Sequence, residues 1–258
     1  MSLEAEIENC GKIHDILAEH WNWAYYDTAH SDTSWLLAEY VNRLKSDIED
    51  RVPTIINELT DILEDYKDES FSILDVGCGV GGFLKRTLTV MPEKFPLVAF
   101  KASGIDISDE MIVYARKNLH GLDVELFCES ITDRALKFKN EPFDIAILMV
   151  TLSFYNDENA KEILCSIHDR LNEDGLIVVM DFAWSYKWSG FKLFSKPLQR
   201  LTDMFFSHLL GESFRFNNRN EEQLLALLNE AGFEVVKSYL SEKKSGMKGM
   251  QVIRARVK

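Results

Sequence analysis

The chain has 258 residues, of which 46% are hydrophobic and 28% are charged, a balance typical of one substantial soluble α/β domain. Its formal net charge of −13 opposes non-specific attraction to DNA or RNA, so nucleic acid is disfavoured as a partner. No apolar run approaches the roughly 20 residues that span a bilayer, and the first residues are unlike the basic start of a secretory signal. The cysteines form no C-x-x-C pair. These features predict a cytoplasmic protein without a disulfide framework or zinc site.

The chain falls into a helical first part and a longer part in which strands alternate with helices. Residues 1–70 repeat apolar side chains every three or four positions, which indicates helices. Further helices are expected after residue 108, near 158–171 and at 221–231. Strands are expected at 71–76, 99–107, 124–128, 143–150, 176–181, 233–240 and 250–257. This order predicts a Rossmann-like, doubly wound, mostly parallel sheet.

The run ILDVGCGVGG at residues 73–82 is the most informative feature, since an apolar strand turns there through glycines into a helix. Gly77, Gly79 and Gly82 satisfy G-x-G-x-x-G, a spacing also found at dinucleotide sites. Asp75, however, stands where its charge would face a pyrophosphate. A ligand that carries an ammonium group suits this turn better.

The sequence Asp-Val-Gly-Cys-Gly-Val-Gly at 75–81 resembles the first motif of class I S-adenosylmethionine (SAM) dependent methyltransferases, and the end of the chain resembles their antiparallel C-terminal hairpin. The resemblance implies a seven-stranded sheet, SAM as cofactor, and methyl transfer to a small, partly apolar or aromatic acceptor at O, N or C. It also implies one domain, 1–258. In that domain residues 1–70 form a helical arm, 71–182 and 217–258 form the SAM-binding core, and 183–216 form a helical lid.

Asp106 ends the second strand, where a carboxylate can bind both ribose hydroxyls; NAD sites use the same arrangement, and helix capping is the alternative. Ser130 stands where many family members have Asp, so either it or Glu129 is expected to meet the adenine amino group, unless Glu129 is simply an exposed loop residue. The resemblance implies further cofactor contacts at the glycine turn, the strand ends and the arm: Asp75, Gly77, Cys78, Gly79, Gly81, Ile107, Met111, Ile131, Leu148, Met149 and Tyr26.

Methyl transfer from SAM requires alignment, exclusion of water and sometimes proton removal, so no nucleophilic residue or metal is expected. His208, Asp181 and His30 are candidate bases, and none is singled out. Aromatic residues of the arm and of the insert 183–216 are expected to surround the acceptor; the insert also suits a dimer contact or a membrane-facing element. Two alternatives stay open: an NAD-linked oxidoreductase, and a non-catalytic SAM-fold module that docks a partner or membrane.

Overall fold

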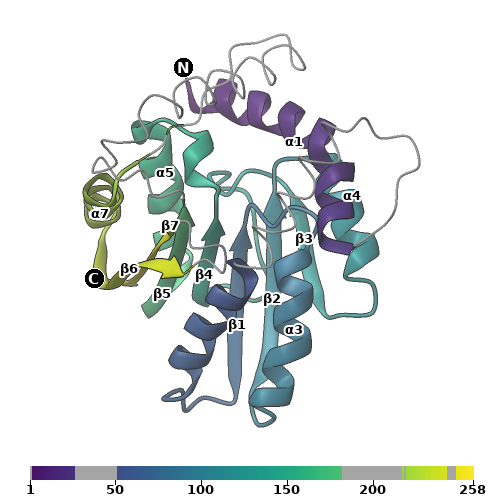
Figure 1. The fold of residues 1–258 in the computed structure, drawn as a ribbon, viewed down its shortest axis with the longest axis vertical. Helices are drawn as coiled ribbons and strands as arrows, with labels where there is room; N and C mark the ends of the chain where they lie inside the picture. Colours follow the sequence, from purple (N-terminus) through teal and green to yellow (C-terminus); the bar gives the residue numbers. More distant parts are fainter. Residues whose placement is uncertain (1, 27–50, 182–216, 218, 243–247) are drawn as a thin grey trace.

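The computed structural model describes residues 2–26, 51–181, 217, 219–242 and 248–258, and a seven-stranded sheet forms its centre (Figure 1). The strand order is β3-β2-β1-β4-β5-β7-β6. Strands β1 to β5 pair in parallel, whereas β7 runs antiparallel to both of its neighbours. The predicted doubly wound sheet with an antiparallel C-terminal hairpin is therefore confirmed. Its strands are β1 (Ser70–Val76), β2 (Ala99–Asp106), β3 (Val124–Cys128), β4 (Phe143–Met149), β5 (Leu171–Asp181), β6 (Phe233–Glu242) and β7 (Lys248–Val257).

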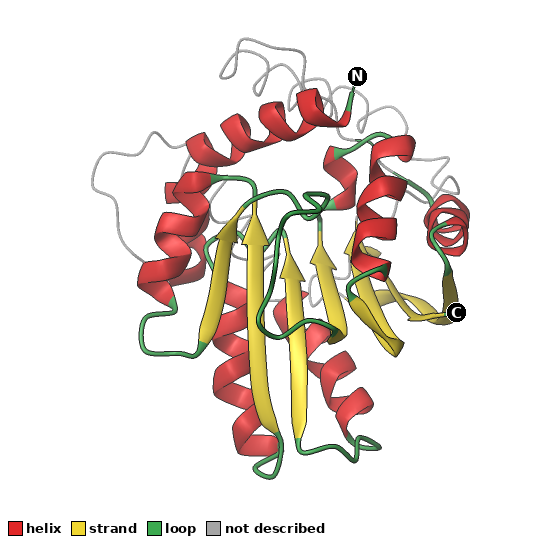
Figure 2. Cartoon of the chain, turned by 180° about the vertical axis from the view of Figure 1, so that it is seen from behind, coloured by secondary structure: helices red, strands yellow, loops and turns green. Residues whose placement is uncertain are grey.

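Helices cover both faces of the sheet (Figure 2). Buried side chains of successive strand positions alternate between two hydrophobic clusters, as a pleated strand requires. One cluster joins the sheet to α3 (Gly82–Lys94), α4 (Asp109–Asn118) and a helical segment at 51–63. The other joins it to α5 (Asp157–His168) and α7 (Glu221–Glu230). No helix in these described parts is long and apolar enough to cross a membrane.

The predicted end of one helix and the predicted start of the strand after it are wrong. Helix α5 ends at His168 instead of continuing to residue 171, and β5 begins at Leu171 instead of residue 176. The reason lies in the neighbouring strand, because Phe143 pairs with Leu171 and its N–H donates to the Arg170 carbonyl at 2.9 Å. Leu171 therefore begins the strand, and the polar residues after it lie in a register shift before the ladder with β4 resumes at Leu176.

Helix α1 (Leu3–Tyr26) lies across the carboxyl ends of the parallel strands (Figure 1). Near its start, buried Glu6 accepts hydrogen bonds from the backbone and side chain of Asn156, at 3.0 and 2.9 Å, and from Asn159 Nδ2 at 2.7 Å. In its middle, Asp15 accepts from Ser108 Oγ at 2.6 Å. Asn156 and Ser108 are the N-caps of α5 and α4, so α1 is attached to the first turns of two core helices.

Candidate functional site

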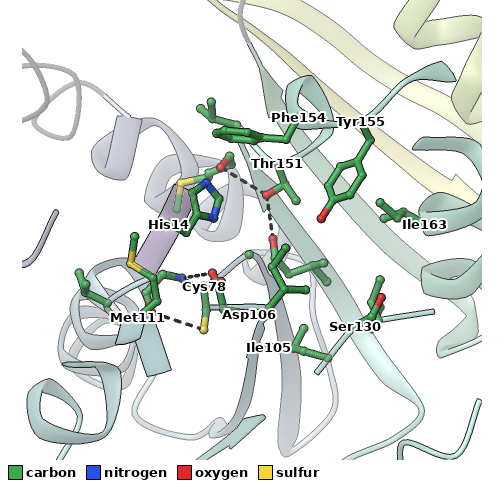
Figure 3. Close-up of a pocket in the computed structure, with 18 of the residues that line it drawn as sticks. His14, Cys78, Ile105, Asp106, Met111, Ser130, Thr151, Phe154, Tyr155 and Ile163 are labelled. Atoms are coloured by element: carbon green, nitrogen blue, oxygen red, sulfur yellow. Dashed lines mark hydrogen bonds between the residues drawn. The ribbon is translucent and has the colours of Figure 1, made fainter. Parts of the chain in front are cut away.

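A cavity lies beneath α1, where β1, β2 and β4 end and the loop after β3 begins (Figure 3). In an open parallel sheet this edge, beside the switch in strand order, is where ligands bind. Most of the residues singled out in the sequence line it: Gly77, Cys78, Gly79, Asp106, Ile107, Met111, Glu129, Ser130, Ile131 and Met149.

The glycine turn follows β1 and forms the floor of the cavity. The N–H groups of Gly77 and Cys78 both donate to the Ile105 carbonyl, at 2.8 and 3.0 Å, which ties the turn to β2. Gly77 and Gly79 have φ angles of +77° and +52°, a conformation that glycine adopts without strain. A Cβ on Gly77 would lie 2.5 Å from Thr151 Oγ1, so glycine is also required there for space.

Asp106 faces the cavity from the end of β2, and its carboxylate is held on both oxygens. Oδ2 accepts the Gly79 N–H at 2.8 Å and Oδ1 accepts the Ser108 N–H at 3.0 Å. The hydroxyl of Ser108 caps α4 by accepting the Met111 N–H at 3.1 Å. Ser108, and not Asp106, is therefore the N-cap of this helix. A carboxylate oxygen has more than one acceptor position, which leaves Asp106 able to bind hydroxyl groups of a ligand.

Asp75 is buried in β1, directly before its last residue, and is not among the residues that line the cavity. Neither carboxylate oxygen has a hydrogen-bond partner among the described residues. Burial, and secondarily the charge of Asp106, raises the pKa of Asp75 to about 8. A buried carboxyl group without a hydrogen-bond partner destabilises the fold unless a ligand or a water molecule binds to it. Such groups are expected at functional positions.

Three further predicted positions also lie outside the cavity lining. Gly81 is the N-cap of α3 with a φ of +78°. Leu148 is fully buried in the core between the sheet and α5. Tyr26, at the end of α1, has Lys85 Nζ 4.8 Å from its ring centroid.

The loop after β3 forms another wall. The Glu129 N–H donates to the Asp106 carbonyl at 3.1 Å, which joins this loop to β2, and the Glu129 side chain is exposed. Ser130 Oγ lies 2.8 Å from Thr132 Oγ1, and Ile131 is buried. A hydroxyl, a carboxylate and an apolar side chain therefore meet on the wall predicted to receive adenine.

Trp21, one of the arm aromatics expected around the acceptor, lines the cavity, whereas sequence reasoning missed five other lining residues: His14, Arg51, Thr151, Phe154 and Tyr155. The His14 ring packs edge-on against Phe154, with centroids 4.6 Å apart (Figure 3). Burial lowers the pKa of His14, while the charges of Asp106 and Asp15 oppose this shift. A signal existed for His14, because it lies between Cys10, Ile13, Leu17 and Ala18 on the apolar face of a helix that the periodicity did predict.

Other sequence candidates fall elsewhere. Asp181 accepts a short hydrogen bond from Ser153 and does not line the cavity. Burial raises the pKa of the Cys78 thiol well above its usual range, so this cysteine does not supply a thiolate. His30, His208 and the insert 183–216 lie outside the described residues. Where side chains are described, no group of three or more His, Cys, Asp or Glu is placed to hold a metal ion.

Comparison with known proteins places this geometry in a family. Residues 73–175 match the model of the methyltransferase domain family. Malonyl-[acyl-carrier protein] O-methyltransferase of Acetivibrio thermocellus is 30% identical over 126 residues, which cover 49% of this chain and 41% of that protein. A carboxy-S-adenosyl-L-methionine synthase of Psychrobacter sp. is 32% identical over 111 residues, which cover 42% of this chain and 39% of that protein. The chain thus spans about two fifths of the length of these curated relatives.

The same fold occurs in a solved structure of magnesium protoporphyrin IX methyltransferase from Synechocystis PCC 6803 with bound SAH, the demethylated product of SAM. The TM-score is 0.67 at 14% identity, over 98% of this chain and 100% of that one. At this identity the likeness concerns the fold alone. The family match over residues 73–175 and the sheet order show that this chain contains a class I SAM-dependent methyltransferase domain.

Proposed function

We propose that this protein binds SAM in the cavity beneath α1 and transfers its methyl group to a small, partly apolar or aromatic molecule. The observation that carries the proposal is Asp106, whose carboxylate is fixed by the N–H groups of Gly79 and Ser108 while it faces the cavity. A carboxylate held in this way is preorganised to accept hydrogen bonds from the two hydroxyls of a ribose.

The remaining lining residues fit the other parts of the cofactor. Arg51 is buried and is the only lysine or arginine among the described residues that line the cavity, so it suits the carboxylate of the methionine portion. Asp75 suits the ammonium group, which it would reach through a water molecule or a side-chain rotation, because it is buried in β1 and does not line the cavity. Ile107 and Ile131 supply apolar surface for adenine, and Ser130 a polar partner.

Bound there, SAM supplies a methyl carbon activated by its sulfonium. The task of the protein is then to orient the acceptor and keep water out. Phe154, Met149 and Trp21 give the cavity apolar walls, and α1 covers it. The aromatic insert 183–216 remains, as predicted from the sequence, the part expected to complete the acceptor chamber.

The comparisons support SAM chemistry and leave the acceptor open. One curated relative is named as an O-methyltransferase and another as a synthase of carboxy-S-adenosyl-L-methionine, so the shared segment serves more than one reaction. The matched segment is the strand-and-turn core, whereas the acceptor contacts are expected from the arm and insert. The acceptor class therefore has to be found by experiment.

Calorimetric titration with SAM, SAH and NAD tests the proposal. We expect saturable binding of SAM and SAH and none of NAD, with affinity reduced by about 10²-fold or more in Asp106→Ala because two hydrogen bonds to a charged group are lost. Asp123→Ala, an exposed aspartate before β3, is the control and should bind normally. Binding of NAD in place of SAH would contradict the proposal.

A second arm addresses catalysis. Methyl-labelled SAM is incubated with small-molecule extracts, and the protein is floated with liposomes in parallel. Transfer of label to a small molecule supports the enzyme. SAM binding with liposome association and without any transfer would instead support the non-catalytic module.

A further inference from the structure

One basic side chain in the cavity is not used by the proposed binding of the cofactor. His14 lies on α1, its ring faces the cavity, and its edge-on contact with Phe154 fixes the ring orientation (Figure 3). Within the described part of the chain, neither ring nitrogen makes a hydrogen bond. A neutral imidazole in this setting keeps an open lone pair directed toward whatever occupies the cavity.

The other titratable groups that line the cavity are unsuited to accept a proton. Burial raises the pKa of Tyr155 and Cys78, so both stay protonated near neutral pH. Asp106 is engaged by two backbone N–H groups and is the candidate ribose ligand. Arg51 is a permanent cation.

Glu129 is the remaining titratable group, and its side chain is exposed to solvent beside the adenine wall. His14 differs from it by position, because α1 holds it over the cavity from the side opposite the sheet (Figure 3). Among the described lining residues, His14 is thus the base best placed to be shielded from solvent once the cavity is filled.

The loss of positive charge from the cofactor during methyl transfer favours protonation of His14. Burial disfavours the imidazolium form of His14, whereas the charges of Asp106 on β2 and Asp15 on α1 favour it. The positive charge of a sulfonium would also oppose protonation of His14, and this charge disappears when the methyl group leaves. A proton accepted by His14 in the same step restores the positive charge of the cavity, next to two carboxylates.

We propose that His14 is the general base of this enzyme and that the acceptor is therefore a hydroxyl or amine that loses a proton, rather than a carboxylate. The inference rests on the proposed methyltransferase function. In the step, the acceptor oxygen or nitrogen forms a bond to the methyl carbon, the carbon–sulfur bond breaks with its electron pair staying on sulfur, and the acceptor proton moves to an imidazole nitrogen of His14.

The first test needs no acceptor. The pKa of His14 is measured by NMR of the protein labelled at histidine Cε1, in complex with SAH and with sinefungin, an analogue that carries a cationic amine near the sulfonium position. We expect a pKa lower by at least about one unit with sinefungin, the direction that a neighbouring cation imposes. His14→Gln identifies the signal, and His168, whose ring packs on Phe233 far from the cavity, should not respond.

The second test measures transfer from methyl-labelled SAM to a panel of phenols, aliphatic alcohols, primary amines and carboxylic acids. We expect transfer to a hydroxyl or amine, with a single-turnover rate that rises with pH in the wild type. In His14→Gln the rate should fall by about 10²–10⁴-fold and lose this pH dependence. In His14→Ala, added imidazole should restore part of the rate, and His168→Gln should match the wild type.

The outcomes separate the two proposals. If neither SAH nor sinefungin binds, the proposed function itself fails. If both bind but the pKa of His14 is the same in the two complexes, or if His14→Gln transfers methyl at the wild-type rate, the function stands and the role of His14 is refuted. Transfer restricted to carboxylic acids would likewise refute it.

Discussion

Substituting Gly77 by alanine tests whether the glycine turn is held by contact with the loop after β4. Gly77 has a φ of +77°, and a Cβ there would lie 2.5 Å from Thr151 Oγ1 and 3.2 Å from its Cγ2. The Thr151 hydroxyl donates to the Val76 carbonyl at 3.0 Å, so the threonine cannot rotate away without losing that bond. Gly121 also has a positive φ, +86°, but a Cβ there would meet nothing within 4 Å, which makes Gly121→Ala a matched control.

The expected cost of Gly77→Ala has three parts. The left-handed conformation costs a non-glycine residue about 1–2 kcal/mol. Loss of the Thr151 hydrogen bond adds about 1 kcal/mol, and overpacking of the closed contact adds about 1–3 kcal/mol. The free energy of unfolding should therefore fall by about 3–6 kcal/mol in Gly77→Ala, a large part of the total stability of a domain, and by about 1–2 kcal/mol in Gly121→Ala.

Urea unfolding followed by circular dichroism measures both variants. The double variant Gly77→Ala with Thr151→Ala should recover part of the loss, because truncation of the threonine frees the space, and the coupling should be about 1–3 kcal/mol. Equal destabilisation of the Gly77 and Gly121 variants, or no coupling with Thr151, would refute the reasoning.

Three other changes have signs that the structure determines. The pKa of Asp75 is raised to about 8, so between about pH 4 and 8 the folded state keeps a proton that the unfolded state has lost. The free energy of unfolding of the wild type therefore falls as the pH rises from about 4 to about 8. Asp75→Asn should thus gain about 3 kcal/mol relative to the wild type between pH 5 and 7.5 in urea unfolding, and an unchanged difference would contradict this. Glu6→Gln should cost about 2–3 kcal/mol by the same assay, whereas the exposed Glu8→Gln is the control and should leave the unfolding free energy unchanged. Arg219→Ala removes a buried guanidinium that donates to the Tyr155 carbonyl at 2.6 Å and to the Leu152 carbonyl at 2.8 Å, so it should lower the unfolding free energy by about 2–4 kcal/mol; a loss below about 1 kcal/mol would contradict this.

The strands could be predicted from the sequence because buried strand positions carry apolar residues. The almost wholly apolar β4 is buried on both faces, and the positions of β1 alternate between two cores. The start of β5 could not be predicted, because it depends on the pairing of Leu171 with Phe143, and the polar residues 172–174 lie in the register shift before the ladder resumes at Leu176.

The site divides in the same way. Asp106 and the turn glycines could be found because their chemistry and spacing are local to one strand–turn–helix unit. Arg51 and Tyr155 could not, since each is brought to the cavity by a different element, and nothing in its neighbouring sequence marks it. Asp75 was found by its position in the motif, but the alternation of side chains along β1 places Val76 in the cavity lining and Asp75 outside it.

The cover of the cavity is coupled to the helices that form it. Glu6 and Asp15 lie nine positions apart on α1, and their carboxylates accept hydrogen bonds at the N-termini of α5 and α4, where negative charge is stabilised by the helix dipole. Displacement of α1 would leave both helix starts without these acceptors and would carry His14 away from the cavity, because His14 stands on the same helix beside Asp15. The two attachments therefore fix the position of the proposed base along with the cover, so a variant that weakens Glu6 should lower both the stability of the fold and the occupancy of the catalytic arrangement.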